Sequence, residues 1–221
     1  MSTSTPLMLP PWQRLLQFVL SLSTFVMMCL LFLDRPLAVW LAVHAGHWVE
    51  PARAFTDNLS ALFLPSLPRW VHPVALIVTG LLLAWQRRML AARTLWLIAL
   101  VLVLTRTTVS ALKAACDRVR PFEYLNDPRL ADFGVAGHDS FPSGHAGTYM
   151  AVLLPLALVL PQWRLPLLLV ATLGSLARVI EGDHYLGDVT ASTVIVLIHI
   201  VLVTALLGRP LGLRFSEPTS P

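Results

Sequence analysis

The stretch HDSFPSGHAGTYMAVLLPLALVL, residues 138–160, passes from a polar loop through Pro-Ser-Gly-His into a long apolar run. The apolar part predicts a helix over Gly144–Leu160, because Pro142 suits a position just before a helix start. A turn of the chain would need only the proline and the glycine. Ser143 and His145 therefore indicate that something is bound where this helix begins.

Most of the chain shares the apolar character of this run. Of its 221 residues, 56% are hydrophobic and 13% are charged, and the mean hydropathy is +0.71. A soluble domain carries roughly a quarter charged residues, whereas repeated apolar runs of about 20 residues are long enough to cross a bilayer. The sequence predicts an integral membrane protein, with residues 1–221 as one membrane-embedded domain and flexible ends at 1–12 and 210–221.

The apolar runs predict an all-α fold, a polytopic membrane helical bundle with six transmembrane helices. Helices are expected because every backbone polar group within lipid must be paired inside its own segment. The predicted spans are Arg14–Leu33, Trp70–Gln86, Thr94–Ala114, Gly144–Leu160, Leu165–Ile180 and Asp188–Leu207. Residues 37–66 are interrupted by prolines, so they predict one or two short extracytoplasmic helices that lie at the interface or dip into it.

The placement of charge predicts which way the spans run. If the N-terminus is cytoplasmic, the inner side has Glu217 as its single acid, and its basic residues are Arg14, Arg87, Arg88, Arg93, Arg164, Arg209 and Arg214. The other eleven acidic residues then lie outside, with eight basic ones. Inner loops that are purely basic close to the spans favour this orientation, with both termini cytoplasmic. The net charge of +4 is thus a feature of topology and does not indicate nucleic-acid binding.

Three polar clusters fall at the outer ends of the predicted spans. KAACDRVRP, residues 113–121, leaves the third span, PSGH, residues 142–145, opens the fourth, and RVIEGDHYLGD, residues 178–188, joins the fifth to the sixth. A loop of about 28 residues, 115–142, links the first two clusters, and loops of that length are usually functional. The clusters are therefore expected to meet on one face.

The residues of these clusters suit a phosphoryl group. Lys113, Arg120 and Arg178 can neutralise its non-bridging oxygens. The start of the fourth helix offers free backbone N–H groups, together with the hydroxyl of Ser143 and a closely approachable backbone at Gly144.

His184 and Asp188 are four residues apart, so on a helical turn they share a face. The carboxylate can then hold the ring Nδ1–H and leave Nε2 as a nucleophile. Half of a metal site is the alternative interpretation of this pair, although no third ligand is obvious.

The three clusters together resemble the signature of the type 2 phosphatidic acid phosphatase family, the membrane lipid phosphate phosphatases related to vanadium haloperoxidases. That signature consists of Lys, six residues and Arg-Pro; then Pro-Ser-Gly-His; then Ser-Arg, five residues, His, three residues and Asp. Order and spacing agree in Lys113–Pro121, Pro142–His145 and Arg178–Asp188, except that Ala177 stands where the third motif begins with Ser.

The resemblance implies a two-step mechanism that uses no metal and no other cofactor. His184 forms a phosphohistidine, Asp188 orients His184, and His145 first protonates the leaving group and then activates water. The residues that hold the charged transition state are Lys113, Arg120, Ser143, Gly144 and Arg178.

The function that the resemblance implies is hydrolysis of a lipid phosphate or diphosphate at the periplasmic face of a bacterial inner membrane. Candidate substrates are undecaprenyl diphosphate, phosphatidate, phosphatidylglycerol phosphate and the phosphate groups of lipid A, and the sequence does not choose among them. A lipid phosphotransferase that uses the same phosphohistidine is one alternative, and a non-catalytic lipid or anion transporter is another. The expected partners are the bilayer and the lipid substrate, without nucleic acid, and the oligomeric state is left open.

Arg106 lies inside the third predicted span, seven residues before Lys113 and on nearly the same face. A charge at that depth usually faces the protein interior and is paired. Arg106 is expected either to pair with Glu181, Asp57 or Asp183, or to support the phosphate pocket from below.

Histidines outside the motifs include His44, His47 and His199. His44 and His47 form a stripe with Glu50 at a spacing of three, which favours an interfacial polar face over a metal site. His199, in the last span, is expected to be a packed or hydrogen-bonded helix residue.

Overall fold

The predicted apolar segments are helices in the computed structural model, which describes residues 7–63, 68 and 70–216. The elements in chain order are β1 (Leu7–Leu9), α1 (Trp12–Met28), α2 (Asp34–His44), α3 (Val49–Phe63), α4 (Val71–Trp85), α5 (Met89–Cys116), α6 (Pro121–Asn126), α7 (Gly144–Val159), α8 (Arg164–Ile180), α9 (Leu186–Leu211) and β2 (Leu213–Phe215). A π-helical turn, Cys29–Leu33, joins α1 to α2, and 3₁₀ turns occupy Gly46–Trp48 and Pro161–Trp163. The fold is all-α, as predicted, apart from one pair of short strands.

Four helical segments are long and apolar enough to cross a membrane: Trp12–His44, Met89–Asn126, Pro161–Ile180 and Leu186–Gly208. The apolar helices α4 and α7 are shorter, with 15 and 16 residues. At about 1.5 Å per residue each is about 23 Å long, less than the bilayer's hydrocarbon thickness of about 30 Å. Of the six predicted spans, four therefore reach the required length within the described residues, and the chain is a multi-pass membrane protein.

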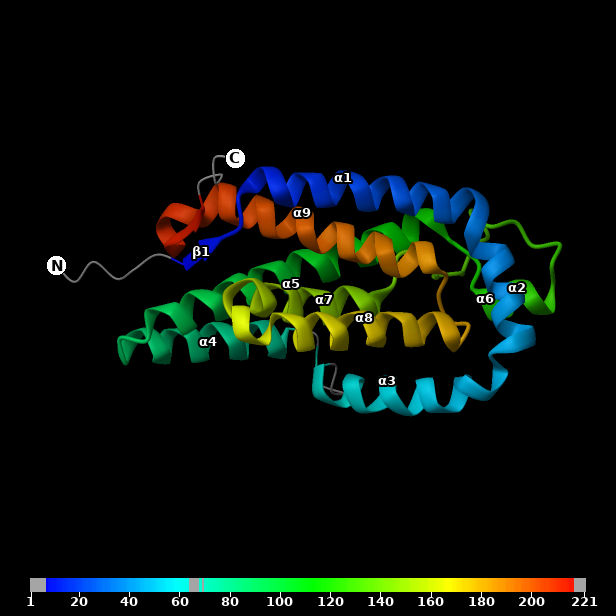
Figure 1. The fold of residues 1–221 in the computed structure, drawn as a ribbon, viewed down its shortest axis with the longest axis horizontal. Helices are drawn as coiled ribbons and strands as arrows, with labels where there is room; N and C mark the ends of the chain where they lie inside the picture. The colour runs from blue at the N-terminus through cyan, green and yellow to red at the C-terminus, as the bar shows by residue number, and fades with distance from the viewer. Residues whose placement is uncertain (1–6, 64–67, 69, 217–221) are drawn as a thin grey trace.

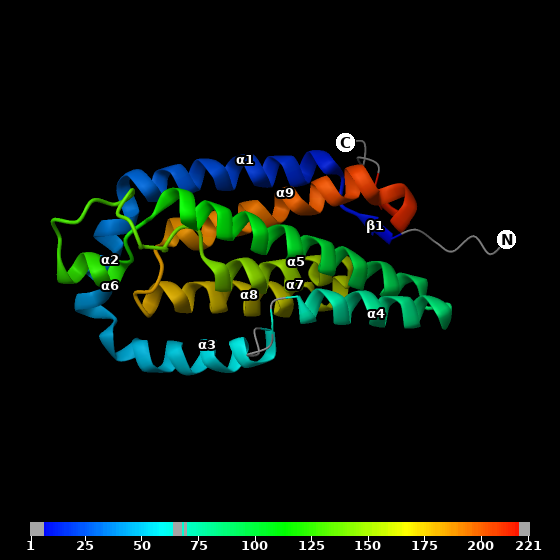
Figure 2. The same cartoon turned by 180° about the vertical axis from the view of Figure 1, so that it is seen from behind.

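The helices lie along one long axis, and the polar clusters come together at one end of it (Figure 1). In the centre α5, α7 and α9 contact one another, with α1 beside α9, α4 beside α5 and α8 beside α7. The C-terminal ends of α5 and α8 and the N-terminal ends of α7 and α9 share the end that carries α2 and α6 (Figure 2). β1 and β2 lie at the opposite end. Antiparallel neighbours thus bring clusters that are far apart in sequence to one place.

The segment predicted as short interfacial helices forms α2 and α3, and its residues 64–66 lie outside the described part of the chain. α3 packs along α8 (Figure 1), and its buried residues are Ala52, Thr56 and Leu59. Gly174 of α8 permits this approach, because a Cβ there would lie 2.5 Å from Leu59 Cδ2. Small residues at helix contacts are typical of membrane bundles, since they let backbones come close.

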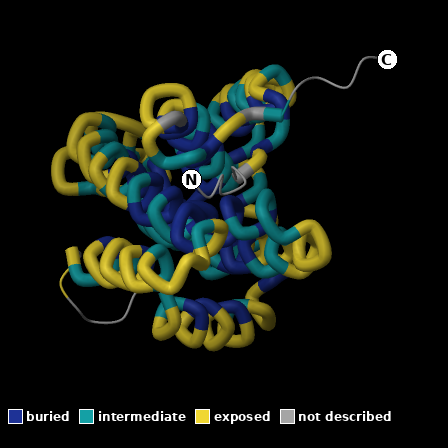
Figure 3. Tube along the Cα trace, turned by 90° about the vertical axis from the view of Figure 1, so that its left-hand side faces the viewer, coloured by how far each residue is buried: buried dark blue, intermediate teal, exposed yellow. Residues whose placement is uncertain are grey.

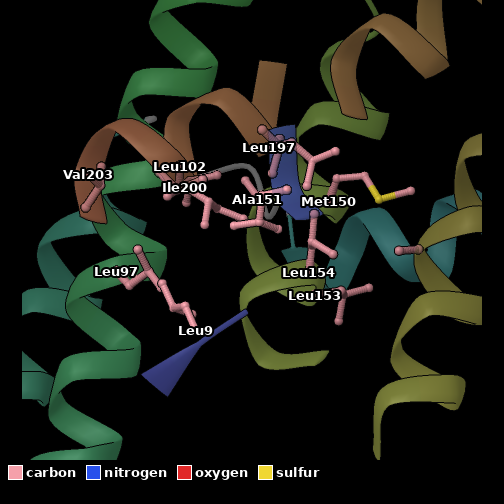
Figure 4. Packing of buried hydrophobic residues seen from close by; sticks show 14 of the residues in the cluster. Leu9, Leu97, Leu102, Met150, Ala151, Leu153, Leu154, Leu197, Ile200 and Val203 are labelled. Atoms are coloured by element: carbon pink, nitrogen blue, oxygen red, sulfur yellow. The ribbon is translucent and has the colours of Figure 1, made fainter. Parts of the chain in front are cut away.

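The core of the bundle consists of buried apolar side chains, most of them from the three central helices, with others from α1, α8, β1 and β2 (Figure 4). Seen along the long axis, burial is concentrated in the middle and exposed residues face outward (Figure 3). Many outward residues are large and apolar; Phe32 is 69% exposed and Leu81 57%. Apolar surface on this scale indicates that lipid covers the outside of the bundle.

The two ends of the chain differ in part from the flexible ends that were expected. Leu7–Leu9 pairs in parallel with Leu213–Phe215, and Leu9 and Leu213 are buried in the core. Gly212, with φ of +65°, makes the turn from α9 into β2, a conformation that glycine adopts without strain. The parts of the expected flexible ends at 1–6 and 217–221 lie outside the described residues.

Candidate active site

The Pro-Ser-Gly-His motif forms the start of α7. Ser143 is the N-cap residue, and its hydroxyl accepts a bond from the Ala146 N–H at 3.4 Å. Its backbone is also fixed, because Ser192 Oγ donates to its carbonyl at 2.7 Å and its N–H donates to the Asp188 carbonyl at 3.2 Å. The sequence predicted that the Ser143 hydroxyl contacts phosphate. In the structure this hydroxyl caps the N-terminus of α7.

A cavity of about 460 Å³ opens beside this helix start. Its lining comes from α4, α5, α7, α8, the turn between α8 and α9, and the loops before and after α6. The lining residues are His72, Thr105, Arg106, Val109, Ser110, Lys113, Arg120, Asp139, Gly144, His145, Thr148, Arg178 and His184. The structure thus brings seven of the nine sequence-predicted site residues to one cavity, and leaves Ser143 and Asp188 behind its wall.

Lys113 and Arg120 converge on one carboxylate, that of Asp139. Arg120 donates to Asp139 Oδ1 through Nε at 3.0 Å and Nη2 at 2.7 Å, and Lys113 Nζ lies 3.3 Å from Oδ2. Burial by itself raises the pKa of Asp139, but the two cations hold it below its ordinary value. Because both cations surround a single anionic group, their geometry suits an anion with several oxygens.

Arg178 is held by two acids in the turn after α8. Its Nη1 donates to Glu181 Oε2 at 2.5 Å, and its Nη2 donates to Asp183. Thr56 of α3 also donates to Glu181, at 2.6 Å, and burial raises the pKa of Glu181 above its ordinary value against these contacts. Glu181 and Asp183, which the sequence offered as partners of Arg106, both pair with Arg178.

His184 is buried, with 2% of its surface exposed, and its Nδ1 lies 2.9 Å from the carbonyl oxygen of Ser140. The predicted partner, Asp188, has its Oδ2 3.6 Å from the same nitrogen, which is too long for a hydrogen bond. Ser140 Oγ donates to that Oδ2 at 2.6 Å, so Asp188 acts on the ring through Ser140.

The protonation of His184 follows from its surroundings. Burial lowers the pKa of His184, although Asp188 opposes the shift. The neutral ring therefore donates Nδ1–H to the Ser140 carbonyl and keeps a lone pair on Nε2. That is the form in which an imidazole can act as a nucleophile.

Arg118 is a residue that the sequence analysis missed. Its guanidinium, fully buried, donates to Asp188 Oδ1 at 2.5 Å, to Asp34 Oδ2 at 2.9 Å and to both oxygens of Asp132 at 3.2 Å. It also lies 4.2 Å from the ring centroid of Tyr185. The signal was present in the sequence, since Arg118 stands inside the first motif and Asp34 directly follows an apolar run.

The polar stripe of His44, His47 and Glu50 has local partners. His44 stacks on Trp40, and Glu50 pairs with Arg53. Within residues 7–63, 68 and 70–216 no three His, Cys, Asp or Glu side chains gather as metal ligands. His199 is hydrogen-bonded as predicted, to Thr105 at 3.1 Å and Thr108 at 3.2 Å.

Comparison with protein families matches residues 94–210 to the PAP2 superfamily, a segment that contains all three motifs. The chain belongs to the PAP2 superfamily. This is the type 2 phosphatidic acid phosphatase family that the motif spacing indicated, and it accounts for the joint presence of Lys113, His145 and His184 around one cavity.

Two curated PAP2 relatives are similar to part of the chain. It is 37% identical over 84 residues to a lipid A 1-phosphatase of Rhizobium etli, over 36% of each chain. It is also 37% identical over 84 residues to a lipid A 1-phosphatase of Rhizobium johnstonii, over 36% of this chain and 34% of that one. The chain therefore aligns with about a third of the length of these relatives.

Among solved structures the chain is similar to a transmembrane PAP2 type phosphatidylglycerolphosphate phosphatase from Bacillus subtilis. The identity is 23% and the TM-score 0.41, over 86% of this chain and 96% of that chain.

Proposed function

We propose that this protein is a membrane lipid phosphate phosphatase that works through a phosphohistidine on His184. The observation that carries the proposal is the convergence of Lys113, Arg120 and Arg178 on one cavity that is also lined by the buried His184, whose pKa is lowered by burial. Fixed cations and backbone N–H groups stabilise the transition state of phosphoryl transfer, and a neutral imidazole supplies its nucleophile.

In the first step the substrate phosphate takes the place of the Asp139 carboxylate between Lys113 and Arg120. Nε2 of His184 attacks phosphorus, so that an N–P bond forms while the P–O bond to the lipid breaks. His145, which lines the same cavity, donates a proton to the departing oxygen, and the lipid leaves with a hydroxyl group.

In the second step water attacks the phosphohistidine. His145 takes a proton from the water, the N–P bond breaks, and inorganic phosphate is released from the restored imidazole of His184. Asp188 keeps that ring in place through Ser140, whose carbonyl holds Nδ1–H at 2.9 Å. Gly144 presents its amide at the N-terminus of α7, where backbone N–H groups and the helix dipole favour an anion.

The proposed setting is a bacterial inner membrane with six spans, both termini cytoplasmic and the cavity periplasmic. The two shorter helices, α4 and α7, are the fifth and sixth proposed spans, because each is apolar and packs against the longer α5. Arg87, Arg88 and Arg164 lie at the helix ends away from the cavity, which supports a cytoplasmic location for that end. Reporter fusions at Arg88 and at Asp132 test this topology, and an external Arg88 would reverse it.

The substrate we propose first is the 1-phosphate of lipid A, because both curated relatives are named for that activity. The test is release of inorganic phosphate by the purified protein in detergent, from lipid A, phosphatidate, phosphatidylglycerol phosphate and undecaprenyl diphosphate in parallel. His184→Ala should abolish release, and chelator should leave the wild-type rate unchanged. Brief reaction with ³²P-labelled substrate should label the wild-type protein, in a form stable to alkali and lost in acid, and should not label His184→Ala. Full activity of His184→Ala would refute the mechanism.

A further inference from the structure

Two hydroxyls on the buried face of α3 reach residues next to the cavity wall. Thr56, which is fully buried, donates to Glu181 Oε1 at 2.6 Å. About one helical turn further on, Ser60 Oγ lies 2.8 Å from the hydroxyl of Tyr149, a fully buried residue of α7. Residues four apart share a helix face, so both contacts hold the same side of α3 against the bundle.

Glu181 joins α3 to Arg178, one of the cations that line the cavity. The side chain of Glu181 is 2% exposed, and its two oxygens have different partners. Oε1 accepts from Thr56, and Oε2 accepts from Arg178 Nη1 at 2.5 Å. Because a carboxylate is rigid and planar, fixing one oxygen also fixes the direction in which the other meets the guanidinium. Thr56 therefore influences where the guanidinium of Arg178 lies.

The second acid on Arg178 is less shielded. Asp183 pairs with Nη2, and its side chain is 27% exposed, compared with 2% for Glu181. Hydrogen bonds to charged groups are stronger where water is excluded, and a buried network with all its bonds made is rigid. Glu181 is thus the firmer of the two supports, as long as Thr56 holds it.

The packing of α3 against α8 places Thr56 within reach of Glu181. Leu59, between the two hydroxyl residues, is buried at Gly174 of α8, where a Cβ would lie 2.5 Å from Leu59 Cδ2 and 3.1 Å from Tyr149 Cδ2. The missing side chain therefore leaves room for both neighbours. Glu181 is the C-cap residue of the same α8, so this close approach of the two helices also sets the contact between Thr56 and Glu181.

We propose that Thr56 is a positioning residue that holds Arg178, through Glu181, in the geometry that binds phosphate. The inference rests on the proposed function, since it takes Arg178 as a ligand of the substrate phosphate. Supporting hydrogen bonds of this kind keep the residues of a site close to their productive geometry. The proposal gives α3 a part in phosphate binding, beyond the interfacial location expected from sequence.

The experiment measures the binding of inorganic phosphate to the purified protein in one detergent by isothermal titration calorimetry. Thr56→Val removes the hydroxyl but keeps the branched shape, and it should raise the dissociation constant about tenfold. Thr56→Ser keeps the donor and should stay near the wild-type value. Thr56→Ala should behave like Thr56→Val, and it replaces that variant if the valine does not fold. A wild-type dissociation constant in folded protein that lacks the hydroxyl would overturn the proposal.

Two further variants separate positioning from a general loosening of α3. Ser60→Ala removes the other hydroxyl but leaves Thr56 and Glu181 paired, so the dissociation constant should not change. An equal loss in Ser60→Ala would assign the effect to the docking of α3 as a whole and overturn the role of Thr56. In an Arg178→Met background, Thr56→Val should weaken binding no further, because residues that act through one another are not additive. A further tenfold loss would show that Thr56 does not act through Arg178.

The wild-type titration tests the proposed function separately. A wild-type protein that binds no phosphate would overturn the proposed function, and this inference with it. Phosphate binding by the wild type, with no change in the Thr56 variants, would overturn this inference alone.

Discussion

Replacing Arg118 by methionine removes the cation that Asp34, Asp132 and Asp188 share. The guanidinium is fully buried, as are Asp34 and Asp188, and its contacts with those two carboxylates are 2.9 and 2.5 Å long. Without Arg118, Asp34 keeps the Gly187 N–H at 2.9 Å as its hydrogen-bond donor among the described residues. Removing one partner of a buried ion pair costs about 3–5 kcal/mol, because the other charge stays buried and uncompensated.

The assay is thermal unfolding of the purified protein in one detergent, with phosphate release measured on the same samples. For a chain of this size a loss of about 3–5 kcal/mol corresponds to a fall of roughly 6–20 °C in the unfolding midpoint. Activity should fall as well, because Asp188 loses the contact that holds it beneath Ser140 and His184. Arg129→Met is the matched control, since that arginine is exposed, and its unfolding midpoint should not change measurably.

A double variant tests whether the unpaired charge is the cause. Asp34→Asn in the Arg118→Met background removes one of the two fully buried carboxylates that lose Arg118. It should therefore recover part of the lost unfolding midpoint, through a coupling of about 1–3 kcal/mol. Arg118→Met that unfolds at the wild-type temperature, or a double variant no more stable than the single one, would refute this account of the network.

The remaining predictions concern the cavity and one helix contact. Burial lowers the pKa of His184, and only the neutral ring can attack phosphorus. As the pH is lowered, kcat/KM should therefore stay constant through pH 6.5 and decrease only near the lowered pKa of His184. A decrease centred on pH 6.5 would show that His184 titrates as an ordinary, solvated imidazole. Asp139→Asn removes the carboxylate that competes for Lys113 and Arg120, so the inhibition constant of inorganic phosphate should fall several-fold in a competition assay, and an unchanged constant would mean that Asp139 does not occupy the phosphate position. Gly174→Ala should lower the unfolding midpoint by the equivalent of about 1–3 kcal/mol, because the new Cβ would lie 2.5 Å from Leu59 Cδ2; Gly46→Ala, with nothing within 4 Å of its Cβ, is the control that should not change it.

Helix positions were largely predictable because the signals for them are local. The span expected at Gly144–Leu160 is α7, Gly144–Val159, and the one expected at Leu165–Ile180 is α8, Arg164–Ile180. The pairing of Leu7–Leu9 with Leu213–Phe215 was not predictable, since two segments of three residues at opposite ends of the chain carry no periodicity. Spacing also put His184 and Asp188 on one helical face, yet it could not show that Ser140 stands between them.

The amino-acid sequence by itself determined that the chain enters a membrane and that three motifs of phosphate chemistry occur in register, because apolar length and motif spacing are properties of short segments. The tertiary structure decided which carboxylate meets which cation. Arg118 reaches Asp34 across 84 positions and Asp188 across 70, and His184 meets Ser140 across 44. Contacts between residues so far apart depend on how the helices pack. In this bundle the packing depends on close approaches between helices and on capped helix ends such as that of α7. These features involve several segments at once, so no single segment of the sequence specifies them.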